Sequence, residues 1–214
     1  MGAVVLRVVD GKQVMQEYNP SPRDAKTTPQ MCQREGMRKI SQLGSKMLAA
    51  INQGFSTNSY PFSAFIKANL KSSVISGSTP DAVTIDWTSV LVAEDTVHNN
   101  TQLYAGTVDY GEAHHLTVSV PFTIYSDLPV AGFSVKLVVY CPDMGQAIVS
   151  PPATGSVASI SCACPSLWDG QEVYVWAFAY ANAGTIDPDA VNTTSSRLPV
   201  YTSKSVFCGS GDLN

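Results

Sequence analysis

Cysteines are the most reactive side chains of this chain, and their number and spacing limit the chemistry open to them. The sequence holds five of them, an odd count, and no two form a Cys-x-x-Cys pair. Cys162 and Cys164 are two apart, so on a β-strand they share one face. The others are the scattered Cys32, Cys141 and Cys208. Because this spacing fits neither a zinc knuckle nor an even disulfide set, we predict buried, reduced thiols that act as small apolar side chains.

The histidines and acidic residues show no catalytic or metal-binding spacing. His114 and His115 are adjacent, so on a strand they point to opposite faces and cannot chelate one ion together. His98 stands in a polar stretch, and the acidic residues are dispersed among turn-forming residues. A glycine-rich phosphate loop is also absent from the sequence. The sequence therefore predicts no enzyme, with no catalytic, cofactor-binding or metal site and no small-molecule substrate.

Composition favours a β-rich protein of the kind found in large assemblies. Charged residues make up 14% of the 214 residues, against about 25% in an average soluble domain. No apolar run reaches the roughly 18 residues that a membrane span needs, and the first residues lack the layout of a secretory signal. We expect a soluble protein, made in the cytoplasm, that is large enough to bury one sizeable core.

The stretch from Glu172 to Tyr180, EVYVWAFAY, is the element that the other elements are expected to cover. Its alternation predicts a β-strand with no polar side. One face holds Val173, Val175, Ala177 and Ala179, and the other holds Tyr174, Trp176, Phe178 and Tyr180. In a two-sheet sandwich one face enters the core, so the opposite face needs a second cover from a helix, an arm or a partner chain.

One long amphipathic helix is predicted from Thr27 or Thr28 to Gly54. A threonine cap, Pro29 in the first turn and Gln30 in capping-box position mark its start. Apolar residues at 3-4-3-4 spacing form a stripe: Met37, Ile40, Leu43, Gly44, Met47, Leu48 and Ile51. The polar side carries Arg34, Arg38, Lys39 and Lys46. The stripe is expected to cover a sheet, either in its own chain or in the next subunit.

The first residues predict a β-hairpin followed by an extended arm. VVLRVV and KQVMQEY flank Asp10-Gly11, a pair that favours the type I′ turn of tight hairpins. Pro20, Pro22 and Pro29 disfavour helix and ladder hydrogen bonds in the next stretch. Because a lone hairpin is barely stable in water, this one is expected to lie against its own sandwich or against a neighbouring subunit.

The remainder predicts a short helix and an immunoglobulin-like antiparallel β-sandwich, so the fold class is mainly β. YPFSAFIKANL has a helical apolar face, with Asn69 placed as a left-handed cap. Further along, the period is two, and turn residues separate the strands at sandwich-like intervals. The expected strands cover 83–92, 103–108, 115–125, 133–141, 146–150, 156–164, 172–180 and 204–208. We divide the chain into an assembly region, 1–79, and the sandwich, 80–214.

Three stretches together resemble one family of proteins. They are GKQVMQEYNPSPRDAKTTPQMCQREGMRKI, PFSAFIKAN with VISGSTPDAVTIDW, and WDGQEVYVWAFAY with YTSKSVFCG. In these stretches the chain resembles an uncharacterised protein family that is found in Bacteroidota genomes, their prophages and their phages. That family has a G-K-Q-V hairpin, a P-x-T-x-x-Q-x-x-x-R helix start and a W-x-G-x-x-V-x-V strand. The resemblance implies no catalytic residues and, by genomic company, a structural component of a virion or a surface.

Charge is divided unevenly along the chain. Residues 1–71 hold ten lysines and arginines against four acids, a net of +6, and the remainder holds three against thirteen, a net of −10. Copies could therefore stack head to tail, or the two signs could neutralise each other within one fold. The candidate interface residues for stacking are Arg23, Lys26, Arg34, Arg38 and Lys39, facing Asp187 and Asp189 of the next copy.

The basic helix also raises the question of nucleic acid. Its cations could touch phosphates, but no aromatic residues interleave with them. Recognition of a specific nucleotide sequence is therefore not expected. A passive role in lining a channel that carries DNA is an alternative.

Together these features predict a non-enzymatic structural subunit of a phage virion, assembled in the host cytoplasm. It is expected to form a homo-oligomer, a ring or a repeated array, and to contact other virion proteins but no membrane. A neck or tail ring is favoured over a decoration protein on the head. The alternative class is an adhesin-like binding module of the bacterial surface, against which the missing secretory signal argues.

Overall fold

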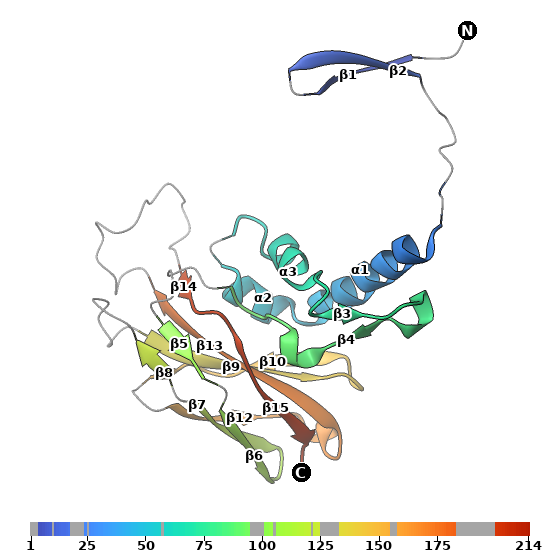
Figure 1. Ribbon diagram of the computed structural model, residues 1–214. Coiled ribbons are helices and arrows are strands. Elements are labelled where there is room, and N and C mark those ends of the chain that lie inside the picture. The colour runs from blue at the N-terminus through green and yellow to red at the C-terminus, as the bar shows by residue number, and fades with distance from the viewer. Residues whose placement is uncertain are drawn as a thin grey trace.

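The computed structural model describes residues 4–9, 11–17, 24, 26–56, 58–94, 101–104, 106–120, 122–124, 133–154, 158–182 and 200–214. Within these ranges the chain is mainly β, as the sequence predicts, and its strand pairings are antiparallel. Figure 1 shows three helices lying over one sheet, with a smaller sheet beyond it.

The larger sheet is built around the strand that the sequence singles out. Its strands are β13 (Glu172–Asn182), β9 (Phe133–Cys141), β10 (Gln146–Val149), β11 (Ala153–Thr154), β14 (Val200–Thr202) and β15 (Val206–Asp212). β9 pairs with one side of β13, and β14 and β15 pair with the other. β10 and β11 pair with the far side of β9. The expected central strand is therefore central in the sheet.

A smaller sheet faces the larger one. It has β7 in the middle and consists of β6 (Thr107–Glu112), β7 (His115–Val120) and β12 (Ala158–Ala163). Two short pairs lie between the N-terminal hairpin and β9 in the sequence: β3 (Ile75–Ser76) with β4 (Thr84–Ile85), and β5 (Thr101–Leu103) with β8 (Phe122–Ile124).

The first hydrophobic core fills the space between the two sheets. Val175 and Ala177 of β13 pack there with Leu116 and Val118 of β7, and all four side chains are fully buried. Complete burial of a valine or leucine side chain contributes about 1.5–3 kcal/mol. The predicted small face of β13 is thus confirmed as the face that points between the sheets.

The aromatic face of β13 is covered by helices of the same chain, α1 (Thr28–Lys46), α2 (Leu48–Gly54) and α3 (Pro61–Asn69). Trp176 and Phe178 share a second core with Met47 and Phe55, and all four are fully buried. Lys136 of β9 adds a polar link, because its Nζ donates to Oε1 of Gln53 at 2.7 Å. The second cover that the sequence demands is therefore internal, and the molecule has three layers.

The predicted long helix bends at Met47. This residue has φ −98° and ψ 17° and separates α1 from α2. Its N–H still donates to the Leu43 carbonyl at 3.0 Å, so the hydrogen-bonded path continues through the bend. With this bend, α1 packs against α3 and α2 packs against β10. As a result Met37 and Leu48, placed in the predicted stripe, are 41% and 47% exposed, whereas the other stripe residues are buried.

Asn69 is not the left-handed cap that the sequence suggests. It is a fully buried residue at the end of α3. Its Nδ2 donates to the carbonyls of Phe65 and Leu91, at 3.0 and 2.8 Å, and its Oδ1 accepts from the Leu91 N–H at 2.7 Å. A buried amide is stable when its hydrogen bonds are made, and here they fasten residue 91 to the helix.

The strand predicted over 83–92 is wrong for most of its length. Only Thr84–Ile85 forms a strand, and Trp87–Ser89 forms a short 3₁₀ turn. Asp86 explains the change, because its carboxylate accepts from the Thr88 N–H at 3.0 Å and from the Ser89 hydroxyl at 2.9 Å. Local side-chain bonds of this kind compete with strand pairing.

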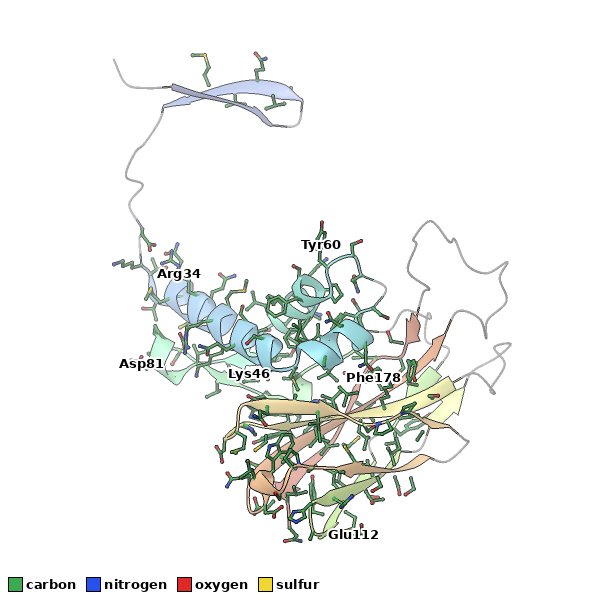
Figure 2. The ribbon with its side chains drawn as sticks, turned by 180° about the vertical axis from the view of Figure 1, so that it is seen from behind. Arg34, Lys46, Tyr60, Asp81, Glu112 and Phe178 are labelled. Carbon is green, nitrogen blue, oxygen red and sulfur yellow. The ribbon has the colours of Figure 1, made fainter. Side chains whose placement is uncertain are left out.

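The predicted N-terminal hairpin is confirmed as β1 (Val4–Val9) paired with β2 (Lys12–Glu17). Gly11 at its turn has φ +75°, a conformation that glycine adopts without steric cost. Figures 1 and 2, which view the molecule from opposite sides, both show the hairpin apart from the three layers.

Candidate assembly surfaces

The hairpin presents apolar side chains to solvent. Val8 is 68% exposed and Met15 is 71% exposed, and Val14 is also exposed. A two-stranded hairpin is marginal in water without a third strand or a packed face. Exposed edges of β-forming residues are ready templates for pairing with another chain. The hairpin is therefore a surface suited to contact with a second protein chain.

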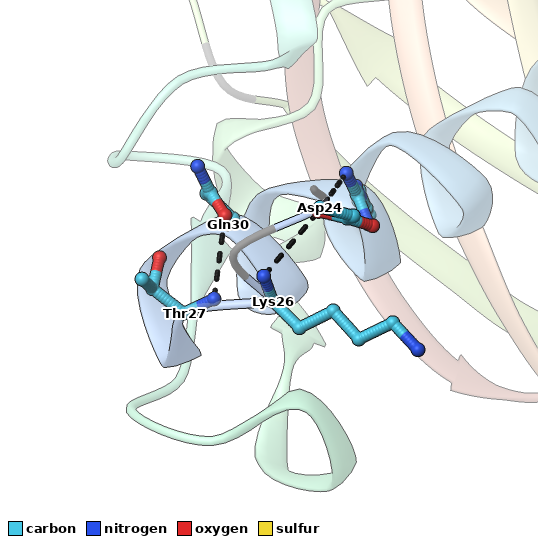
Figure 3. Close-up of polar contacts among 5 residues, drawn as sticks. Asp24, Lys26, Thr27 and Gln30 are labelled. Carbon is cyan, nitrogen blue, oxygen red and sulfur yellow. Dashed lines mark hydrogen bonds and ion pairs between the residues drawn. The ribbon is translucent and has the colours of Figure 1, made fainter. Parts of the chain in front are cut away.

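The start of α1 is fixed by local polar contacts, shown in Figure 3. The Gln30 side chain accepts from the Thr27 N–H at 3.3 Å, as expected of a capping box. Asp24 accepts from the Lys26 N–H at 3.3 Å and from the Arg34 guanidinium at 2.5 and 2.9 Å. The hydrogen bond from Arg34 is the main cause that lowers the pKa of Asp24 below its usual range. The predicted helix start is confirmed.

Two further residues of the predicted interface, Arg38 and Lys39, also have partners within the chain. The Arg38 guanidinium bonds the Glu35 carboxylate, with Nε at 2.7 Å from Oε2. Lys39 Nζ donates to the Val83 carbonyl at 2.5 Å. Exposed ion pairs contribute little to folding, because solvent and salt screen them. The two pairs do change the surface charge, because Asp24 and Glu35 neutralise Arg34 and Arg38 within the chain.

The described residues include only some of those predicted for the interface. Lys26, Arg34, Arg38 and Lys39 lie along the first half of α1 and its cap. Arg23, Asp187 and Asp189 lie outside the described residues. The proposed pairing of the basic and acidic members therefore stays a prediction.

A cleft of about 360 Å³ separates the end of α1 from the β9–β10 turn. We call it the lysine-lined cleft, and its walls include Lys39, Gln42, Lys46, Trp87, Tyr140 and Gly145. Trp87 is the centre of an aromatic group, with ring centroids 5.7 Å from Tyr140 and 4.8 Å from Tyr174. No carboxylate is among the described lining residues; Glu172 lies behind the aromatic group, where its carboxylate accepts from the Tyr174 hydroxyl at 2.9 Å. The cleft combines cations with an aromatic wall.

Acidic residues gather where three chain segments meet, at the end of β6 in the small sheet and of β13 and β15 in the larger sheet. We call this group the acidic end, and it consists of Glu112, Asp169, Glu172 and Asp212. Backbone bonds hold the segments together, since Gly170 N–H donates to the Leu213 carbonyl at 2.7 Å and His114 N–H donates to that of Asn214 at 2.8 Å. The His114 ring lies 2.8 Å from the Asp169 carboxylate.

The prediction of buried thiols holds for three of the five cysteines. Cys141, Cys162 and Cys164 lie in the core between the sheets, whereas Cys32 and Cys208 are only partly buried. Within the described ranges no group of histidine, cysteine and acidic residues could hold a metal ion. No described helix is long and apolar enough to cross a membrane.

Sequence reasoning missed the lysine-lined cleft. It assigned Lys46 to the polar side of a helix and Trp87 to a strand. The walls of the cleft come from three parts of the sequence, near residues 40, 87 and 142. The spacing of these residues along the chain does not indicate that they meet. The signal that could have pointed to Trp87 was Asp86 with Thr88 and Ser89, a combination that favours a turn.

Comparisons of this chain with models of protein families, with curated proteins and with solved structures find no match.

Proposed function

We propose that this protein is a non-enzymatic structural subunit of a bacteriophage virion, which assembles with copies of itself and with other virion proteins. The resemblance to a family of Bacteroidota phages and prophages supports the setting, and within it we favour a neck or tail ring. The observation that carries the assembly role is the β1–β2 hairpin, which lies apart from the three layers and exposes Val8 and Met15.

The three layers differ from the hairpin because their apolar faces are already packed inside the chain. Both faces of β13 are already covered, one by the small sheet and one by the helices. Trp176 and Phe178, its largest aromatic side chains on the helix side, are fully buried. No described element covers the hairpin in this way, so a neighbouring subunit is the natural source of the packing that two strands need.

We propose further that the two facing sheets are an immunoglobulin-like sandwich. Antiparallel pairing and a common core between the inner faces support this assignment. An experimental structure whose strand order departs from that topology would contradict it.

Removal of residues 1–26 tests the assembly role. We expect the truncated chain to stay folded and soluble, because the three layers keep both cores, and to lose its oligomeric state. Sedimentation velocity reports the oligomer, and far-UV circular dichroism reports the fold. A truncated chain that unfolds, or one that still assembles, would contradict the proposal.

Point variants on the hairpin sharpen this test. Val8→Asp together with Met15→Asp places charges where apolar side chains are exposed, so this double variant is expected to weaken assembly as the truncation does. Gln13→Ala is a matched control, because Gln13 is exposed on the same hairpin and is polar. If the double variant assembled as well as the control, the hairpin would not be the assembly surface.

A further inference from the structure

The lysine-lined cleft takes its cations from α1 of the helical layer, whereas Glu112 of the acidic end lies on β6 of the small sheet. We propose that the cleft of one copy receives the acidic end of a second copy, so that subunits join head to tail. This inference rests on the proposed role as a repeated subunit and names one of its contacts. The part that enters is the β6–β7 turn with Glu112, and it meets Lys46 and Lys39.

The lysines of the cleft retain hydrogen-bonding capacity. Lys46 has neither a hydrogen-bond nor an ionic partner among the described residues. Its Nζ lies by the β9–β10 turn, where a Cβ at Gly145 would be 3.7 Å away. Lys39 uses one of its three N–H donors on the Val83 carbonyl, and two remain. By contrast, Arg34 and Arg38 are each occupied by a carboxylate of the same chain.

The acidic end is held in a fixed arrangement. Glu172 and Asp212 are register partners in neighbouring strands, and Glu112 is the register partner of His115 across the β6–β7 turn. Glu112 is exposed and has no partner in the part of the chain that the structure describes. His114 and His115 are the basic residues of this turn, and His114 already faces Asp169. A carboxylate on a protruding turn is therefore available to a neighbouring molecule.

The contact must join two copies because one chain cannot make it alone. Lys39 and Lys46 belong to α1, in the helical layer, and Glu112 belongs to β6, in the small sheet. The larger sheet lies between these two layers. Figure 2 shows Lys46 at the helices and Glu112 at the far end of the sheets.

Shape and surface complement the charges. A cleft of about 360 Å³ admits the few side chains of a turn. Trp87 and Tyr140 supply an aromatic wall for the apolar parts of those side chains. Because the two surfaces differ, the contact is heterologous, and repetition closes a ring or extends a filament according to the rotation between copies.

Charge-reversal variants test the contact through mixing. Lys46→Glu and Glu112→Lys each place like charges across it, so each variant alone is expected to associate about fivefold more weakly than the wild type. An equimolar mixture offers Glu at position 46 to Lys at position 112 and wild-type Lys46 to wild-type Glu112. The mixture is therefore expected to recover wild-type association in sedimentation velocity at low salt.

Lys67→Glu is the matched control, because Lys67 is an exposed lysine of the helical layer that does not line the cleft. Alone it is expected to associate like the wild type, and mixed with Glu112→Lys it is expected not to restore wild-type association, because Lys46 still faces Lys at position 112. Thermal melts establish that every variant is folded. Failure of the mixture to recover would overturn the inference, as would equal loss in the Lys67 control.

The test also separates this contact from the hairpin. If truncation of residues 1–26 abolishes assembly and the charge reversals have no effect, the structural role stands and the cleft contact is wrong. If the wild-type chain does not associate at all, both proposals fail. If Lys46→Glu leaves self-association intact but weakens binding of a synthetic acidic peptide, the cleft serves another partner and the contact between copies is wrong.

Discussion

The Tyr110 hydroxyl is buried where β6 meets β15, and it has no hydrogen-bond partner among the described residues. The ring fits against glycine, since a Cβ at Gly211 would lie 2.8 Å from it. Burial is the main cause that raises the pKa of Tyr110 to about 12. A buried polar group without a partner costs about 1–3 kcal/mol, so the ring stabilises this corner and the hydroxyl does not.

Tyr110→Phe is therefore expected to raise the free energy of unfolding at neutral pH by about 1 kcal/mol. The variant also changes the alkaline response. Because the pKa of this tyrosine is about 12 in the folded chain and 10.0 when unfolded, its ionisation leaves the free energy of unfolding unchanged below pH 10 and lowers it as pH rises through 12. The variant is expected to lose less stability over that interval.

Urea unfolding at neutral and alkaline pH measures both effects. Tyr174, whose pKa is also raised to about 12, mainly by burial, remains in the variant and leaves it part of the alkaline loss. If Tyr110→Phe had a lower free energy of unfolding than the wild type at neutral pH and lost as much of it at alkaline pH, the Tyr110 hydroxyl would have a stabilising partner.

At the scale of elements, α2 approaches the rest of the chain through Gly54. A Cβ at this position would stand 2.1 Å from the Val92 carbonyl oxygen and 2.9 Å from Ala93. The Gly54 carbonyl also accepts from the Thr202 hydroxyl at 3.2 Å. The end of α2, residues 92–93 and β14 therefore meet at a contact that has no room for a side chain.

Gly54→Ala is expected to destabilise the fold by about 1–3 kcal/mol, because backbone must move to admit the methyl group. Asn52→Ala is the control, since Asn52 is an exposed residue of the same helix; its effect is expected within about 0.5 kcal/mol. Urea denaturation of the two variants provides the comparison, and equal stability would show that residues 92–93 yield without cost.

The elements also show which parts of this fold were readable from the sequence. The alternation of β13 predicted both of its faces because a strand has a period of two whatever covers it. The bend at Met47 and the exposure of Met37 were hidden, because an amphipathic stripe is consistent with a straight helix on a wide surface. The cleft was hidden for a related reason, since its walls meet only after α1 and β9 have packed on β13.

For the whole molecule, the shared core of helices and sheet implies cooperative unfolding. Ile40 of α1, and Met47 between α1 and α2, lie in one cluster with Val138 of β9 and Trp176 of β13. Loss of the helices would expose these side chains, each worth about 1.5–3 kcal/mol when buried. The helices and the sheets are thus coupled by the same apolar surface.

A single thermal transition is the expected result, with calorimetric and van't Hoff enthalpies in agreement. Residues 80–214 alone are expected to be poorly soluble, because β13 would present Trp176 and Phe178 to water. Two separated transitions, or a soluble and folded 80–214 fragment, would show that the boundary at residue 80 divides independent folding units.

The placement of the three tryptophans gives this chain an optical probe in each of its compartments. Trp168 lies in the core between the sheets, Trp176 lies in the core between helices and sheet, and Trp87 lines the cleft. Indole emission shifts to longer wavelength when water reaches the ring. Variants that keep one tryptophan each would therefore report separately on the opening of either core and on whatever enters the cleft, by fluorescence and without any attached label.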